Sequence, residues 1–157
     1  MGSVDKRIAP LVSAIFCLVL LSCASTQAVK KPPAFRLADV TLSKALGDES
    51  PIPSPKNPAT IFSRQDSEIV AFVKLINLWG VHILKWDWFD PQGNLYYSTG
   101  NYTIKCPEGK YLKEVSTWHK LSILGEPQES VIGHWTLNVY LDKEIVAVRT
   151  FTIGDSP

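Results

Sequence analysis

Apolar and polar residues alternate along much of the chain after about Ile61, a pattern typical of half-buried β-strands. In residues 69–77, Lys74 interrupts the even positions, whereas the odd positions are apolar as far as Leu75. We therefore expect the odd set to face a core. Its members are Ile69, Ala71, Val73 and Leu75.

The same alternation continues in residues 81–89. The charged side chains Lys85 and Asp87 mark one side of this strand as solvent-facing. The other side then faces the core, and its members are Leu84, Trp86 and Trp88.

The last two strands give the clearest pattern. Four apolar residues alternate with polar ones before a tight turn at Asp142-Lys143; they are Trp135, Leu137, Val139 and Leu141. After the turn, residues 144–153 place a second apolar set on one face, interrupted by Arg149. This set is Ile145, Ala147, Phe151 and Ile153. The two segments predict a β-hairpin.

Turn signals separate these runs. Residues 90–94, 107–109 and 125–127 combine proline with glycine or other turn-forming residues. Residues 47–58 contain four prolines, so they cannot form a central strand or a helix, and we expect a surface connection or an edge covering. Seven to nine short strands without a convincing helix predict an all-β antiparallel sandwich or barrel.

The N-terminus has a different pattern. Lys6-Arg7 precedes an apolar run of about 14 residues, from Ile8 to Leu21. A membrane-spanning helix needs roughly 20 apolar residues, so an export signal is favoured over a transmembrane anchor. A plain secretory signal cleaved near Ala24 or Ala28 is one reading of this segment.

The stretch Leu20-Leu21-Ser22-Cys23 gives a more specific reading. It resembles the lipobox of bacterial lipoproteins, in which the cysteine is lipidated and becomes the mature N-terminus. The resemblance implies a signal peptide over residues 1–22, lipidation of Cys23 and a tether over residues 23–34. Because Ala24 stands where an aspartate commonly retains such proteins at the inner membrane, the resemblance favours the outer membrane.

Residues 35–157 then form one β-sandwich domain. The segment from Gly133 to Asp142, followed by Phe151-Thr152-Ile153, resembles the last hairpin of bacterial immunoglobulin-like modules. Trp86-Asp87-Trp88 and the turn at residues 90–93 add to this resemblance, which covers roughly Phe62 to Ile153. It implies an immunoglobulin-like antiparallel two-sheet sandwich and says almost nothing about activity.

The charge balance and the number of cysteines limit which partners and which covalent links the domain can have. Residues 1–22 carry Lys6, Arg7 and Asp5, so the remaining 135 residues have 14 basic and 14 acidic side chains. A balanced charge argues against a nucleic-acid partner, which would need clustered basic residues. With Cys23 committed to lipid, Cys106 is the one thiol of the predicted domain, and no internal disulfide forms. We expect Cys106 to be buried and inert.

Candidate catalytic and metal-binding groups do not form a motif. His82, His119, His134 and Cys106 could supply metal ligands, but no two have ligand spacing such as H-x₃-H or C-x₂-C. A nucleophile–base–orienter set is also not recognisable in the sequence. We therefore predict no catalytic residues, no bound metal, no cofactor and no enzymatic activity.

Aromatic residues near predicted loops and edges are the candidate binding surface. Six of them could stack on a ligand or line a protein interface: Trp79, Tyr96, Tyr97, Tyr102, Tyr111 and Trp118. The competing interpretation is that they fill the core or cover the ends of the sandwich. The sequence thus predicts a lipid-anchored binding or scaffolding module on the periplasmic face of the outer membrane. Another envelope protein is its expected partner, and a glycan bound by aromatic residues is the alternative.

Overall fold

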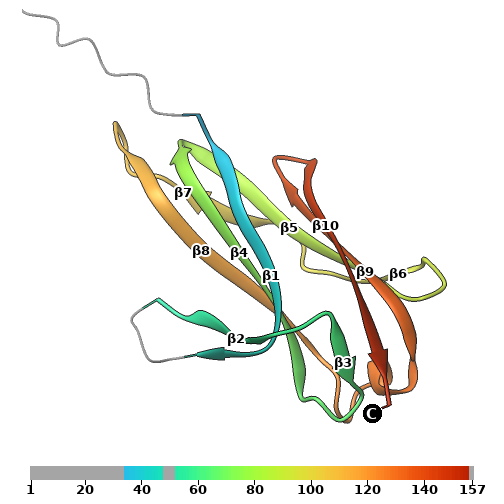
Figure 1. Ribbon diagram of the computed structural model, residues 1–157. Helices are drawn as coiled ribbons and strands as arrows, with labels where there is room; N and C mark the ends of the chain where they lie inside the picture. Colours follow the sequence, from blue (N-terminus) through green and yellow to red (C-terminus); the bar gives the residue numbers. More distant parts are fainter. Residues whose placement is uncertain (1–33, 48–51, 156–157) are drawn as a thin grey trace, which may run out of the picture. The chain divides into compact units, whose positions relative to one another are not determined.

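The computed structural model describes residues 34–47 and 52–155, which belong to the second of two units of the chain, residues 31–157 (Figure 1). Ten strands and one short 3₁₀ helix make up this part of the chain. They are β1 (Arg36–Gly47), β2 (Ser54–Pro58), β3 (Ile61–Ser63), β4 (Glu68–Trp79), β5 (Val81–Phe89), β6 (Leu95–Ser98), β7 (Tyr102–Lys105), β8 (Tyr111–Ser122), η1 (Pro127–Ser130), β9 (Gly133–Leu141) and β10 (Glu144–Gly154). Within these residues, no helix has the length and hydropathy needed to span a membrane.

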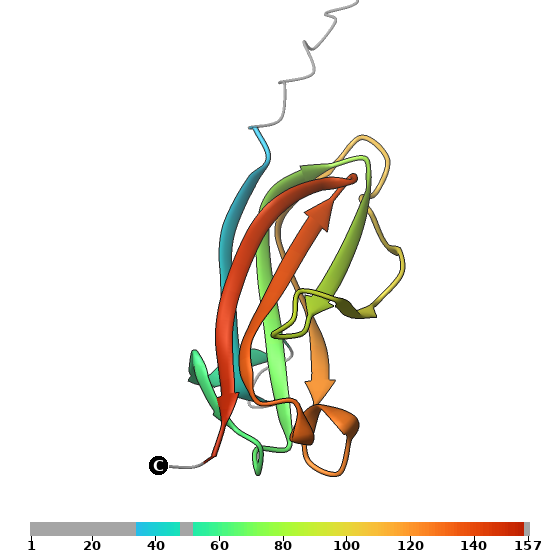
Figure 2. The same ribbon diagram turned by 90° about the vertical axis from the view of Figure 1, so that its right-hand side faces the viewer.

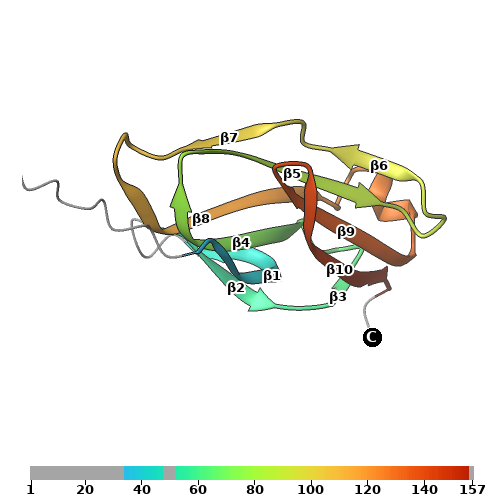
Figure 3. The same ribbon diagram turned by 90° about the horizontal axis from the view of Figure 1, so that it is seen from above.

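The strands form two sheets. One sheet has the order β2-β1-β4-β8, and the other has the order β3-β10-β9-β5-β6, with β7 also paired to β5 (Figure 3). Every pairing is antiparallel except that of β3 with β10. The expected immunoglobulin-like antiparallel sandwich is therefore confirmed, with ten strands in place of seven to nine.

The core lies between the two sheets, where the alternation predicted it. Ile69, Ala71, Val73 and Leu75 of β4 have no exposed surface. The core faces of β5 and β9 are equally well buried, and Trp88 and Trp135 are its largest fully buried side chains. Trp88 meets Phe151 edge to face, with ring centroids 5.8 Å apart. This burial of large apolar side chains is the dominant stabilising term for a fold without a disulfide in its core.

The proline-rich segment adds an edge strand. In β2, Ser54–Pro58 pairs with the end of β1, and only one side of it is hydrogen-bonded to a neighbour. An edge position tolerates proline because the missing N–H is needed there on one side only. The expectation of an edge covering is confirmed, although the segment forms a regular strand.

The prediction for β10 fails at one position. The register with β9 shifts between Ile145 and Ala147, so Val146 packs against the core and Ile145 is 54% exposed. A bulge inserts one residue into a strand and reverses which face the next residues occupy.

Arg149, which interrupts the apolar set of β10, links the two sheets. Its Nε donates a hydrogen bond to the Val40 carbonyl of β1 at 2.9 Å.

The expected solvent-facing side of β5 is also partly wrong. Asp87 is only 5% exposed, and one of its oxygens accepts a hydrogen bond from Lys85 Nζ at 2.6 Å. The Lys85 ammonium also lies 4.4 Å from the centre of the Tyr140 ring. This side of β5 is therefore partly buried although it carries two charged residues, because the apolar stem of a lysine can pack on the protein surface while its ammonium reaches a partner.

The sandwich has two distinct ends. We call the end where the described chain begins, at Ala34, the proximal end; it holds the start of β1, the β4–β5 turn, the β7–β8 turn and the β9–β10 turn. The opposite, distal end holds the β8–β9 connection with η1 and the end of β10. Figure 2 shows the β9–β10 turn and the start of β1 at one end and the C-terminus at the other.

Candidate functional site

The six predicted aromatic residues do not form one surface. Tyr96 and Tyr97 of β6 line a cleft near the distal end, Trp79 and Tyr111 lie opposite each other at the proximal end, and Trp118 lies on the outer face of its sheet. Tyr102 is 55% exposed and contacts Trp86 edge to face, with ring centroids 6.5 Å apart. The six residues therefore belong to separate regions of the domain and do not form a common binding platform.

The distal cleft lies between β6, β8 and η1, with a volume of about 590 Å³. Its walls are Tyr96, Tyr97, His119, Lys120, Leu121, Ser122, Glu126, Pro127 and Gln128. Tyr97 stacks on His119, with ring centroids 5.3 Å apart and an interplanar angle of 19°. The cleft therefore combines flat aromatic surface with side chains that can donate and accept hydrogen bonds.

Tyr96 forms the floor of this cleft instead of an exposed platform. Its ring packs edge to face against Trp135 at 5.1 Å, and its hydroxyl donates a hydrogen bond to Gln128 Oε1 at 2.8 Å. Burial raises the pKa of the Tyr96 hydroxyl, and the charge of Glu126 raises it further. Tyr96 thus stays protonated and fixes η1 against β6.

His119 joins the cleft to the core. The Trp88 indole donates a hydrogen bond from Nε1 to His119 Nδ1 at 3.1 Å, and the ring of Trp86 lies 6.2 Å from that of His119. Because Nδ1 accepts this bond, the neutral ring carries its proton on Nε2. Burial lowers the pKa of His119 below its ordinary value of 6.5.

The cleft borders an open strand edge. In the described sheet, β8 pairs with β4 on one side and has no strand on the other. The Ile123 N–H donates to the Ser67 carbonyl at 2.9 Å, and the register from Glu68–Ser122 to Ile76–Glu114 is continuous. Antiparallel ladders alternate in their hydrogen-bonding direction, so the backbone groups of Trp118, Lys120 and Ser122 point away from β4.

Trp118 extends the aromatic surface around the outside of this edge. It lies opposite Phe72 in the register and is 37% exposed, whereas Phe72 is 4% exposed. Ion pairs bound the two rings on either side, with Lys74–Glu114 at 3.0 Å and Lys120–Glu68 at 2.9 Å. The free edge of β8 therefore has aromatic side chains on both of its faces.

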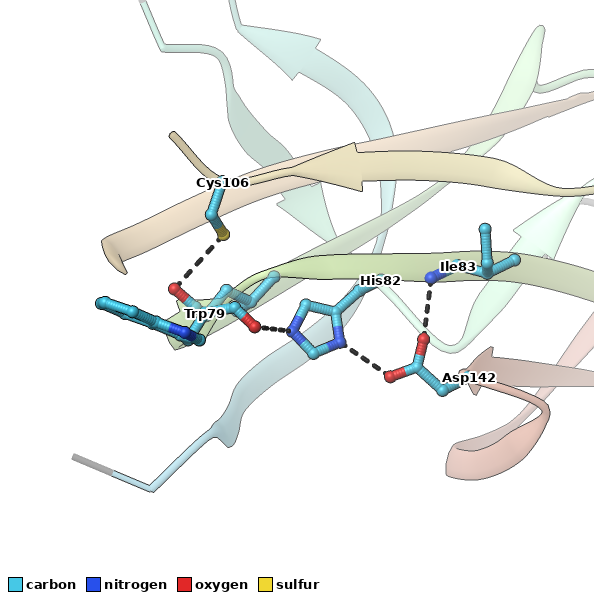
Figure 4. A network of polar contacts seen from close by, with 6 residues as sticks. Trp79, His82, Ile83, Cys106 and Asp142 are labelled. Atoms are coloured by element: carbon cyan, nitrogen blue, oxygen red, sulfur yellow. Dashed lines mark hydrogen bonds and ion pairs between the residues drawn. The ribbon is translucent and has the colours of Figure 1, made fainter. Parts of the chain in front are cut away.

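A second polar network lies at the proximal end (Figure 4). His82 Nδ1 is 2.7 Å from Asp142 Oδ2, and His82 Nε2 is 3.1 Å from the Trp79 carbonyl oxygen. The other oxygen of Asp142 accepts the Ile83 N–H at 2.9 Å. Burial by itself raises the pKa of Asp142, but these hydrogen bonds and the nearby His82 hold it below the ordinary value. The network ties the β4–β5 turn to the β9–β10 turn.

Cys106 lies beside this network but does not join it. The thiol is 5% exposed and donates to the Leu78 carbonyl at 3.3 Å, and His82 directs its Nε2 to Trp79 instead. The expected burial of Cys106 is confirmed.

The four candidate metal ligands do not form one cluster, since His119 contacts Trp88 and His134 contacts Thr152. Within the described ranges, no three histidine, cysteine or acidic side chains come close enough to hold a metal ion.

Cys23 lies outside the described residues, so its lipidation stays a prediction. The sequence offered His119 only as one of four candidate metal ligands, and it did not single out the free edge of β8. The available signal for His119 in the cleft was its position on the same strand face as Val115, Leu121 and Ile123. The free edge depends on which strands pair, and no local pattern encodes that.

Comparison with known proteins gives weak similarities to solved structures only. No protein-family model and no curated protein sequence matches the chain. An immunoglobulin-like protein from Pseudomonas aeruginosa is similar over 79% of this chain and 99% of its own, with 16% identity and a TM-score of 0.47.

The alkylpurine DNA glycosylase AlkC of Pseudomonas fluorescens, solved with DNA containing an abasic site analogue, is similar over 76% of this chain, with 8% identity and a TM-score of 0.45. The match spans 30% of the glycosylase's length. At these values neither similarity bears on function, and the class of fold follows from the strands and sheets themselves.

Proposed function

We propose that this protein is a lipid-anchored, non-catalytic binding module of the bacterial cell envelope that holds another envelope protein at the distal cleft. The stretch Leu20-Leu21-Ser22-Cys23 supports the anchor. The observation that carries the binding role is the free edge of β8 beside an aromatic-lined cleft of about 590 Å³.

An extended polypeptide suits this geometry. Strand addition to a sheet edge supplies main-chain hydrogen bonds, and adjacent pockets for side chains supply specificity. Here the outward backbone groups of Trp118, Lys120 and Ser122 would offer the hydrogen bonds, and the cleft beside Tyr97 and His119 would receive a side chain.

The non-catalytic role is supported by how the reactive groups are used. His82 and Asp142 are engaged with each other and with backbone groups, and Cys106 is buried against a carbonyl. His119 accepts a hydrogen bond from an indole and has an aromatic ring stacked on it. A general base needs to reach a substrate proton, and these contacts favour structural roles.

Membrane anchoring adds to the binding role. A lipid on Cys23 would confine the domain to two dimensions and raise its effective concentration near membrane-bound partners. Two or more acyl chains give stable anchoring, whereas one chain gives only marginal binding.

The test compares two tyrosine variants in cross-linked envelopes. Tyr97→Ser removes the ring that stacks on His119, and Tyr102→Ser removes a similarly exposed ring outside the cleft. We expect wild type and Tyr102→Ser to capture the same protein and Tyr97→Ser to capture it about tenfold less, the effect of losing an interface hot spot. Equal capture by all three, or capture of no specific protein, contradicts the proposal. Tyr97-dependent binding on a glycan array without a cross-linked protein establishes the carbohydrate alternative.

A further inference from the structure

We propose that the proximal end is a membrane-docking surface that rests on anionic phospholipid headgroups. The proposal rests on the proposed lipid anchor, because the anchor is what brings the proximal end to the bilayer. It adds an orientation of the domain, with the proximal end on the membrane and the distal cleft directed away from it.

Exposed aromatic side chains gather at this end, whereas exposed aliphatic side chains also occur at the distal end, among them Ile61 and Leu124. Trp79 and Tyr111 are opposite each other in the β4–β8 register and are 39% and 43% exposed. Val81 follows the β4–β5 turn and is 59% exposed, and Phe35, at 38%, lies against the His82 ring with centroids 6.2 Å apart. In Figure 4 the Trp79 indole extends away from His82 and Asp142. Tryptophan and tyrosine are the residues enriched at the membrane–water interface.

A local reversal of the strand pattern places Trp79 outward. Asn77 has a φ of 60°, and after it Leu78 is fully buried although it has the parity of the outer face. Trp79 then points outward together with its partner Tyr111, and Leu112 packs against the core beside Leu78. The two rings therefore stay in solvent because of a specific backbone feature of β4.

The charges of this end suit an anionic surface. Five exposed cations lie on the proximal turns and strand ends, and none of them has an ion pair within the described residues; they are Arg36, Lys105, Lys110, Lys113 and Lys143. The acidic residues here are Glu108, Glu114, Glu144 and Asp142, of which Glu114 is paired with Lys74 and Asp142 with His82. At the distal end Asp66, Glu68 and Asp155 pair with lysine or arginine, and the further charged side chains include the cation Lys56 and the acidic residues Asp90 and Glu126. The balanced total thus conceals a group of cations without ion pairs at the proximal end.

The short link to Cys23 favours docking. Ala34 begins the described chain at the proximal end, eleven residues after Cys23, and Lys30 and Lys31 lie within that link. Eleven fully extended residues reach at most about 40 Å. A lipidated Cys23 therefore keeps the proximal end within that distance of the headgroups, where basic residues are attracted to anionic lipid within about a Debye length.

The experiment uses residues 23–157, whose core draws only on side chains from Leu37 to Ile153. Cys23 is coupled to a maleimide lipid in vesicles, while Cys106 stays unreacted because it is 5% exposed. Tryptophan fluorescence is then measured with brominated lipids as quenchers. Vesicles of phosphatidylethanolamine with phosphatidylglycerol are compared with vesicles of phosphatidylcholine.

We expect quenching in the phosphatidylglycerol vesicles, most of it lost in Trp79→Phe and retained in Trp118→Phe. Lys110→Glu combined with Lys113→Glu changes only exposed side chains, and it should weaken quenching several-fold without affecting the core. Absence of quenching, quenching that survives Trp79→Phe, or equal quenching in both lipids overturns the docking surface. Because the coupling supplies the anchor chemically, these results are independent of whether cells lipidate Cys23.

Discussion

At the scale of single residues, His119 shows how one side chain links the core to the cleft. It accepts the Trp88 indole hydrogen and supports the Tyr97 ring. The hydrogen bond from Trp88 favours the neutral ring, since protonation of Nδ1 would set two N–H groups against each other. The conformation of the cleft therefore depends on the protonation state of His119.

This dependence predicts that acid destabilises the fold through His119. Burial lowers the pKa of His119 in the folded state below the value of 6.5. As pH falls through 6.5 the unfolded chain binds a proton that the folded chain does not, so the free energy of unfolding decreases until the pH passes the folded-state pKa. Above pH 6.5 both states are neutral and this term vanishes.

Urea unfolding between pH 7.5 and pH 5 checks this prediction. His119→Gln should flatten the fall in the free energy of unfolding, whereas His134→Gln retains it because His119 is still present. If the His119→Gln and wild-type curves stay parallel over this range, His119 is not the group responsible.

The sequence predicted which aromatic residues lie near strand edges, but it did not predict which of them are covered by contacts with distant parts of the chain. Trp79, Tyr97, Tyr102, Tyr111 and Trp118 are all more than one third exposed, as an edge position implies. Tyr96 is half-buried because Gln128 and Trp135, which come from later parts of the chain, cover it. Contacts between residues more than 30 positions apart are set by strand pairing, and alternation along one strand contains no information about them.

At the scale of elements, alternation predicted the buried faces because the side-chain period of a strand is two. It failed where the backbone departs from that period, at the bulge between Ile145 and Ala147. The β9–β10 turn was predicted correctly. Asp142 and Lys143 adopt φ values of 53° and 75°, as a two-residue turn between twisted strands requires.

A glycine sets the start of β9. Gly133 has a φ of 138°, and a Cβ at this position would lie 2.9 Å from the Cβ and Cγ atoms of Pro91 in the β5–β6 turn. We predict that Gly133→Ala destabilises the fold by roughly 1–3 kcal/mol, because it forces an unfavourable backbone conformation and displaces the proline ring. The free energy of unfolding from urea titration measures this.

Gly154→Ala is the matched control for Gly133→Ala. Nothing lies within 4 Å of a Cβ at Gly154, and its backbone lies outside the left-handed region. We expect a change of less than about 0.5 kcal/mol, as for most surface substitutions. Equal destabilisation by the two substitutions would contradict a specific contact with Pro91.

At the scale of the whole described domain, the two ends differ in chemistry. The proximal end carries exposed aromatic residues and unpaired cations, and the distal end carries the cleft. In the arrangement that we propose, the lipid anchor and the docking surface lie at one end of the sandwich, and the partner binds at the other. The sequence predicted the lipid anchor and the fold, whereas this polarity emerges only when the turns are assigned to ends.

The anchor at Cys23 is the claim on which this arrangement depends most directly. Metabolic labelling with a fatty-acid analogue should label the wild-type protein, and Cys23→Ala should lose the label and move to the soluble fraction. Cys106→Ala serves as the control and should stay labelled, since that thiol is buried. A wild-type protein without label, or a Cys23→Ala protein that keeps both its label and its membrane fractionation, would contradict the account.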